Sequence, residues 1–455
     1  MNERGPGVNI PHVADARAEE VFVRIRYVSA VGLVIVGGAL LGGALLFATS
    51  RPSNGMSAAM QQPPAPPAPC PASPSWISSP NPPMEIGNGT PISQQTNCQF
   101  YQFSWQWFLA LVTPAKGPQT GYRVFETLPM FIPGKSDQCG GAGARLLTDL
   151  ASVGDSMFVR TNKPAAPPYR FLFPQDIKQA GDKDVLYDQS GNVIFYNVRF
   201  NQTECQATAA GFPPGTMEIK TAWRRIQPQD RSRYYTINAL VQGVSPMPIP
   251  LGLVAFHLVR NTKDHPEFVW ASFEHQDNVP DCTKPQATPS AGWSFLSNAC
   301  AQCLAQNGIG GCPQCGFNTA TKNTGLTGTP DQICRVFPDG TGPQDTPNNV
   351  VNRFNVDTLN SQLVGPNGFL TKLPDSNPMA IWKNYVNVGA LWTNGGLAST
   401  PANQRGSLQL ANATMETFLQ SNTNCFSCHN YDPKQPLAVS HIYSSLKGTA
   451  LSKTP

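Results

Sequence analysis

The sequence predicts an α+β fold: a mainly antiparallel β domain, preceded by a transmembrane helix and a proline-rich tether and followed by a helical C-terminal region. Three observations lead to this prediction. Short β-prone runs separated by turn residues lie between 184 and 273, apolar residues follow helical spacing near 98–113 and after 351, and one long apolar run lies near the N-terminus. The expected segments are 1–26 (polar N-terminus), 27–49 (membrane helix), 50–93 (linker), 94–281 (β-rich domain), 282–335 (cysteine-rich insertion) and 336–455 (helical region).

Composition restricts the classes of partner. Only 13% of the 455 residues are charged, below the usual quarter, and 44 prolines and 39 glycines favour loops and strands over surface helices. The formal net charge is +4 and no basic run occurs. We therefore expect no nucleic-acid partner.

The apolar run extends from Tyr27 to Ala48. As a helix it is about 33 Å long, which matches the hydrocarbon thickness of a bilayer. Arginines are concentrated before the run and one follows it closely: Arg4, Arg17, Arg24 and Arg26 before, Arg51 after. This asymmetry predicts a single-pass membrane protein with residues 1–26 in the cytoplasm and the remainder exported. A cleaved signal peptide is the alternative, although the run is long for one and no A-x-A site follows.

Residues 50–93 resemble a tether, because prolines recur through them and favour extended polyproline II backbone. Cys70 lies inside this stretch. The sequence leaves open whether it pairs with a cysteine of the domain or with another chain.

The β-rich domain begins with the aromatic stretch Cys98–Gly117. It is expected to form a helix that ends before Pro114 and packs Phe103, Trp107 and Ala110 into a core. A hairpin is expected over 184–200 around a Gln-Ser-Gly-Asn turn. Further strands are expected at Met217–Arg224, Arg233–Val241, Leu251–Val259 and Glu267–Phe273.

Three helices are expected in the C-terminal region. The first covers 351–364, and the second follows Asn377-Pro378 with Tyr385 on its apolar face. The third is capped by Asn412 and carries Met415, Phe418 and Leu419 on one face.

Twelve cysteines favour an oxidising compartment. Cys300-x-x-Cys303 and Cys312-x-x-Cys315 resemble zinc half-sites, but the gap between the pairs is shorter than in common zinc ribbons. In an exported chain we predict disulfide bonds here, with zinc as the alternative.

The most specific motif is Cys425-Phe-Ser-Cys428-His429, the C-x-x-C-H pattern of covalent haem attachment. Two thiols add to the two vinyl groups of one haem, and the adjacent imidazole binds the iron as proximal ligand. We predict one covalent haem c held by Cys425, Cys428 and His429. His441 is the first candidate for the distal iron ligand and Met415 a weaker one. A disulfide-bonded or metal-binding C-x-x-C is the alternative.

Several further segments occur in the same order as in a known group: FSWQWFLAL (103–111), EIKTAW (218–223), FEHQDNVP (273–280) and ANATMETFLQ (411–420) before CFSCHN. Together with the haem motif they resemble a poorly characterised bacterial family of exported single-haem cytochrome c proteins. The resemblance implies a periplasmic haem protein, and it supplies no substrate. The apolar run adds the expectation that this protein is anchored in the bacterial inner membrane. The chain differs from small soluble cytochromes c, in which the motif comes early and a methionine ligand follows it.

Electron transfer to an unknown redox partner is the favoured function, because a tether and one haem suit a periplasmic carrier. The alternative is a haem c enzyme, peroxidase- or oxygenase-like, because the body is larger than one shuttling haem requires. Its distal acid–base or charge-stabilising groups are sought among polar residues of the sheet domain: His257, His275, Glu274, Asp277 and either Arg224 or Arg225. A haem-based sensor or binding module is a third, less favoured class.

Overall fold

The computed structural model describes residues 68–117, 121–133, 138–139, 170–172, 180, 184–241 and 243–447. The chain divides into two units, residues 1–64 and residues 65–455, and the described residues all belong to the second. The predicted membrane segment 27–49 lies outside them. Among the described residues, no helix combines the length and the apolar character that a bilayer crossing requires.

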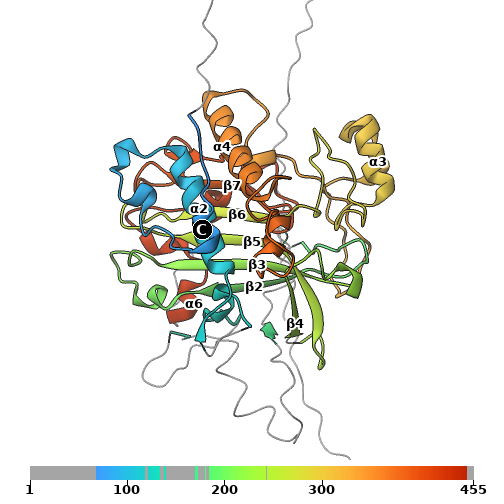
Figure 1. Ribbon diagram of the computed structural model, residues 1–455, viewed down its shortest axis with the longest axis horizontal. Coiled ribbons are helices and arrows are strands. Elements are labelled where there is room, and N and C mark those ends of the chain that lie inside the picture. Colours follow the sequence, from blue (N-terminus) through green and yellow to red (C-terminus); the bar gives the residue numbers. More distant parts are fainter. Residues whose placement is uncertain are drawn as a thin grey trace, which may run out of the picture. The chain divides into compact units, whose positions relative to one another are not determined.

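A mainly antiparallel sheet forms the centre of this domain, as predicted (Figure 1). Its longest strand, β5, pairs antiparallel with β3, β4 and β6. β2 pairs antiparallel with β3, β7 with β6, and β8 with β7. The short β1 pairs parallel with β4. The strands are β1 (Arg170–Leu172), β2 (Phe195–Phe200), β3 (Met217–Arg225), β4 (Thr236–Val241), β5 (Ile249–Arg260), β6 (Val269–His275), β7 (Tyr385–Thr393) and β8 (Gln404–Gly406).

Helices and tight turns surround the sheet. The α-helices are α1 (Ser75–Ser78), α2 (Asn97–Val112), α3 (Asn298–Asn307), α4 (Pro347–Val364), α5 (Cys425–Cys428) and α6 (Tyr443–Lys447). The 3-10 helices are Ile86–Asn88, Ile92–Gln94, Val124–Thr127, Gln202–Gln206, Pro228–Asp230, Ile309–Gly311, Pro313–Cys315, Pro338–Gly340, Ala380–Asn384 and Pro436–Val439.

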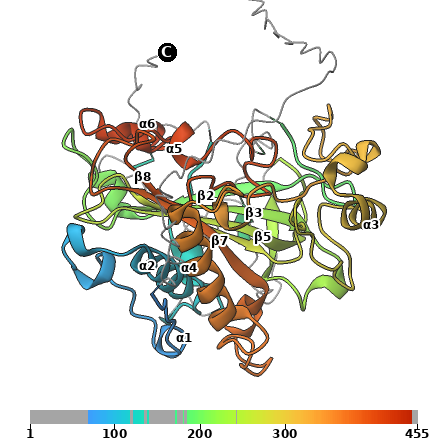
Figure 2. The same cartoon turned by 90° about the horizontal axis from the view of Figure 1, so that it is seen from above.

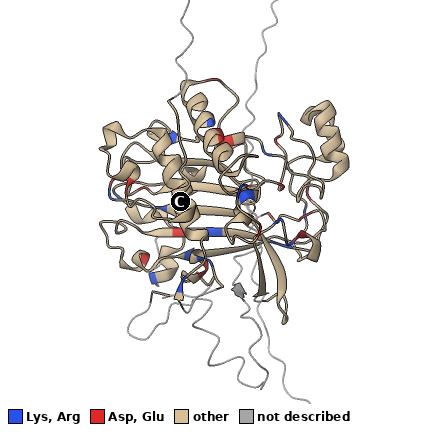
Figure 3. Cartoon of the chain, in the orientation of Figure 1, with Lys and Arg blue, Asp and Glu red and all other residues tan. Residues whose placement is uncertain are grey.

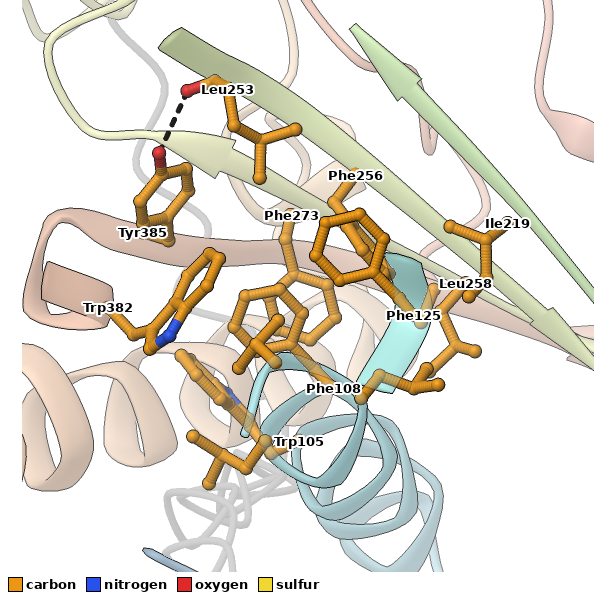
Figure 4. Close-up of a cluster of buried hydrophobic side chains, with 14 of the residues drawn as sticks. Trp105, Phe108, Phe125, Ile219, Leu253, Phe256, Leu258, Phe273, Trp382 and Tyr385 are labelled. Carbon is orange, nitrogen blue, oxygen red and sulfur yellow. Dashed lines mark hydrogen bonds between the residues drawn. The ribbon is translucent and has the colours of Figure 1, made fainter. Parts of the chain in front are cut away.

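The predicted aromatic helix is α2. It begins at a capping box formed by Thr96 and Gln99 and ends at Val112, before Pro114. Its inner face packs on the sheet. The ring of Phe108 stacks on Phe273 of β6, with a centroid distance of 4.0 Å, inside a cluster of buried aromatic rings (Figure 4). Edge-to-face contacts of Phe108 with Trp105, Phe256 and Trp382 add to this packing.

The C-terminal segments cover the other side. Figure 2 shows α5 and α6 on one side of the sheet and α2 and α4 on the opposite side. Along paired β5 and β6, side chains alternate, so Phe256 and Phe273 face α2 while His257 and Trp270 face the C-terminal segments. Every residue of β6 is buried, as expected of a strand covered on both faces.

The C-terminal region is less helical than predicted. Only the helix expected at 351–364 is found as such, as α4. Residues 377–388 form the 3-10 helix Ala380–Asn384 and the start of β7 instead. β7 lies between β6 and β8, so hydrogen bonds on both of its edges replace the expected helical ones.

The helix expected after Asn412 is also absent from the described residues, which form turns there. The Asn412 side-chain amide donates to Ser272 Oγ at 2.9 Å, and its oxygen accepts from the Thr414 backbone N–H at 2.9 Å. Such side-chain bonds compete with helical hydrogen bonding. The segment is therefore fixed against β6 rather than coiled.

The C-terminal part of the predicted linker is packed on the domain. Cys70 forms a disulfide with Cys98 at the start of α2, the Gln102 side chain donates to Pro71 O at 2.7 Å, and the Glu85 carboxylate accepts from the Asp264 backbone N–H at 3.1 Å. A free tether over the whole of 50–93 does not agree with these contacts. Proline content alone did not reveal them.

All ten cysteines outside the C-x-x-C-H motif form disulfides: Cys70–Cys98, Cys139–Cys205, Cys282–Cys334, Cys300–Cys315 and Cys303–Cys312. The last two are nested and join α3 to the turns that follow it. This confirms the prediction of disulfide bonds in the cysteine-rich insertion.

Candidate functional site

The C-x-x-C-H motif lies on one short helical turn. α5 begins after Asn424, whose side chain and that of Ser427 form a capping box. The Asn424 amide also donates to Gln404 Oε1 at 2.7 Å and to Leu408 O at 2.9 Å, which joins the turn to β8. Because residues three apart lie on the same side of a helical turn, Cys425 and Cys428 point the same way.

These two cysteines are the free ones. Cys425 is half-buried and Cys428 is exposed. Burial, followed by the negative charge of Glu416, raises the pKa of both thiols, to well above the ordinary value for Cys425. The site therefore presents two unpaired, protonated thiols in a chain that otherwise pairs every cysteine.

A cavity of about 290 Å³ lies beside the motif, at the lower end of the range for small-molecule pockets. Strands β2, β3, β5 and β6 form one wall, and the segment from 416 to 442 forms the other. Its apolar lining comes from Phe131, Val198, Val259, Trp270, Leu419 and Ile442, and its polar lining includes Glu218, Lys220, His257 and Glu416. Cys425, Cys428, His429 and His441 border the same space.

The ring of His429 is held from two sides. Its Nδ1 lies 2.9 Å from Val439 O, and because a carbonyl only accepts, Nδ1 carries the proton and Nε2 keeps a free lone pair. The ring of Trp270 packs against it at a centroid distance of 4.4 Å. Burial, followed by the neighbouring His441, lowers the pKa of His429 to about 3, so the imidazole is neutral.

His441 lies next to His429 rather than across the cavity from it. The two rings stack at a centroid distance of 3.8 Å and an interplanar angle of 17°. Nε2 of His441 lies 2.8 Å from Cys428 O, to which it donates. To reach the far side of a group bound by His429, the His441 ring would have to leave this stack and break this hydrogen bond.

Ionisable side chains of the sheet face the cavity. Lys220 of β3 and His257 of β5 are direct cross-strand neighbours. Nε2 of His257 lies 3.2 Å from Glu416 Oε1. Burial alone would raise the pKa of Glu416, but the charge and hydrogen bond of His257, with Lys220, lower it to about 2. Burial lowers the pKa of Lys220.

Two carboxyl groups form a second polar cluster at the edge of the cavity. Glu204 is fully buried and accepts from Ser440 Oγ at 2.8 Å, and Glu218, which lines the cavity, is hydrogen-bonded to it. Burial, followed by the proximity of Glu218, raises the pKa of Glu204 well above its ordinary value; burial also raises the pKa of Glu218. The pair therefore retains a proton.

Comparison with family models, curated proteins and solved structures finds no match to this chain. The resemblance to exported single-haem proteins therefore stays a prediction from the quoted segments. The site has to be interpreted from its own geometry.

Met415, the weaker candidate ligand, does not border the cavity. It is buried in a separate apolar cluster with Phe295, Ile333 and Ala413. Its sulfur is therefore part of the core on this side of the sheet. The predicted attachment cysteines Cys425 and Cys428 and the predicted iron ligands His429 and His441 border one cavity, and Met415 does not.

Of the acid–base candidates, His257 alone lines the cavity. His275 is buried between aromatic rings and bonded through Nε2 to Arg233 O at 2.8 Å. Glu274 and Asp277 form ion pairs with arginines, Arg335 at 2.9 Å and Arg233 at 2.6 Å. Arg224 pairs with Asp188 at 3.3 Å, and Arg225 is not among the cavity residues. None of these five residues lines the cavity.

Sequence reasoning missed Lys220, Trp270 and Glu416 as site residues. One signal for Lys220 was available, because it lies two residues after Glu218 in the predicted strand and both therefore lie on one face. Nothing in the order of residues showed which segment covers that face. Charged residues of both signs are interspersed over the described chain (Figure 3), so charge clustering gave no further indication.

Proposed function

We propose that this chain is a c-type haem protein that transfers electrons, with one haem bound covalently by Cys425 and Cys428 and with His429 as the proximal ligand. The observation that carries the proposal is the pair of free thiols on one helical turn, bordering a cavity together with a neutral imidazole whose Nε2 is free. These are the groups that covalent attachment and iron ligation require.

The side chains of the site would each support such a haem. A haem bound there supplies an iron that exchanges one electron. The hydrogen bond from His429 Nδ1 to Val439 O fixes the ring orientation and increases the basicity of Nε2. Trp270 and the apolar walls limit the access of water, while the exposed Cys428 places one edge of the site at the surface, where a redox partner can approach.

The domain is proposed to be periplasmic and held at the inner membrane by residues 27–49. The apolar run and its flanking arginines support this topology. We expect proteinase added to spheroplasts to release a soluble haem domain by cutting within 52–67, because residues from 68 onward pack on the domain and Cys70 is bonded to Cys98. Released fragments are detected by haem staining. A haem domain that stays intact in unbroken spheroplasts but is cut after lysis would mean the opposite topology.

A haem enzyme is the second candidate function. Two observations favour it: His441 lies beside His429, and ionisable groups face the cavity from β3 and β5. An iron with one open position and proton-carrying groups nearby is what small-molecule chemistry requires.

The His441→Ala variant tests the sixth iron position. If His441 is the distal ligand, the native ferric protein is low-spin and the variant becomes high-spin and binds carbon monoxide once reduced. If His441 stays in its stack on His429, the native protein is already high-spin and the variant has the same spectrum. Absorption spectra of both proteins, oxidised and reduced, distinguish the two.

A further inference from the structure

We infer that His257, oriented by Glu416, is the distal acid–base group of a site that reduces hydrogen peroxide. The inference rests on the proposed haem and on an open position at its iron. It assigns a role to a sheet residue that the attachment motif does not specify.

The position of His257 follows from strand pairing. On β5 it alternates with Phe256 and Leu258, which pack in the core on the α2 side, so His257 faces the C-terminal segments. There it borders the cavity shared by the two thiols and His429. The thiols and His429 belong to the 416–442 wall and His257 to the sheet wall, so a haem held by the thiols would have His257 among its neighbours in the same cavity.

Glu416 gives His257 the environment of a proton-transfer group. Its Oε1 lies 3.2 Å from His257 Nε2, and its Oε2 accepts from the Asn412 backbone N–H at 2.9 Å, which holds the carboxylate in place. Asn412 is in turn bonded to Ser272, the cross-strand partner of His257. A carboxylate fixed in this way accepts from the imidazole and fixes its orientation and tautomer.

The chemistry balances with groups that the proposed function already requires. Reduction of one hydrogen peroxide breaks the O–O bond, takes up two electrons and two protons and forms two waters. One-electron donors of the electron-transfer chain supply the electrons. His257 accepts the proton from one peroxide oxygen and returns it to the other oxygen as that oxygen leaves, while solvent supplies the remaining protons through the exposed mouth at Cys428.

A small substrate agrees with the dimensions of the site. A cavity of about 290 Å³ is smaller than a haem, so an attached haem would fill it and extend to the surface at Cys428, which restricts any further ligand to a few atoms. The neighbouring Lys220 supplies positive charge where the substrate loses a proton.

Cyanide and carbon monoxide test this role without measuring turnover. Hydrogen cyanide must lose a proton to a base when it binds ferric haem, whereas carbon monoxide binds ferrous haem with no proton transfer. We expect His257→Gln, which keeps a polar side chain of similar size, to slow cyanide association about 100-fold or more and to leave carbon monoxide association unchanged. Glu416→Gln, on the loop, should also slow cyanide selectively, and decides the question if the strand variant fails to fold.

The outcomes separate this inference from the haem proposal. Wild-type protein without covalent haem on a stained denaturing gel overturns both. Haem-loaded wild-type protein that binds neither ligand overturns only the peroxide site. So do variants that bind cyanide at the wild-type rate, and variants in which both ligands slow equally, because an equal effect is steric.

Discussion

Replacing both Cys425 and Cys428 by alanine removes all covalently bound haem from the denatured protein. In the proposed attachment each thiol forms one of the two thioether bonds, and no other cysteine is free to replace them, since the remaining ten are in disulfides. Each single variant should keep a weaker haem stain through its remaining bond. Denaturing gels stained for haem, with protein loading matched by antibody, measure the effect.

The matched control is the Cys303→Ala/Cys312→Ala double variant. It also removes two cysteines, but they are those of the disulfide that joins α3 to the following turn. Its covalent haem should equal that of the wild type. Haem that persists in the Cys425→Ala/Cys428→Ala protein would disprove attachment at the motif, and loss of haem in both double variants would indicate a folding defect.

Local sequence patterns predicted much of the fold. α2 ends where Pro114 required it, and the strands found as β3, β5 and β6 lie within a few residues of their predicted positions. Of the hairpin predicted at 184–200, only the turn is found, with the isolated bridge Tyr187–Val193 and the Asp188 N–H bond to Asn192 O at 2.9 Å, while Phe195–Phe200 pairs with β3. These elements depend on contacts near in sequence, so propensity and periodicity suffice.

The predictions of secondary structure fail where contacts between residues distant in sequence determine the local conformation. The sequence predicts Tyr385 on the apolar face of a helix, yet pairing of β7 with β6 extends it as a strand, opposite His275. Asn412 is a good helix cap, but its side chain bonds to Ser272, 140 residues away in the chain. A single sequence does not show these partners, and tertiary hydrogen bonds override the local preference.

The candidate site also has a part that local sequence predicts and a part that depends on distant contacts. The motif that the proposed attachment uses can be found in the sequence, because Cys425, Cys428 and His429 lie within five residues and their spacing is specific. The walls of the site come from four strands and a loop. Whether His257 or His275 faces the cavity depends on the packing of β5 and β6 beneath the C-terminal segments, which their sequence context does not distinguish.

Arg335 joins the sheet to the segment that carries the site. Its guanidinium donates to Glu274 Oε2 and Asp281 Oδ1, both at 2.9 Å, and the Glu274 side chain has no exposed surface. The other Glu274 oxygen accepts from the Ala413 backbone N–H at 2.7 Å. Ala413 begins the segment that contains Glu416 and leads to Cys425, so this buried network fixes the cavity wall to β6.

Arg335→Ala should lower the free energy of unfolding by about 3–5 kcal/mol, because it leaves the Glu274 carboxylate buried without its cation. Chemical unfolding of the haem-loaded protein, followed by the far-ultraviolet circular dichroism, measures this loss. Arg353→Ala is the matched control. Arg353 pairs at the surface with Asp345, whose side chain is 82% exposed, so its removal should cost about 0–1 kcal/mol. Equal stabilities for the two variants would show that the Arg335 network does not hold this wall, and the position assigned to Glu416 beside His257 would lose its structural basis.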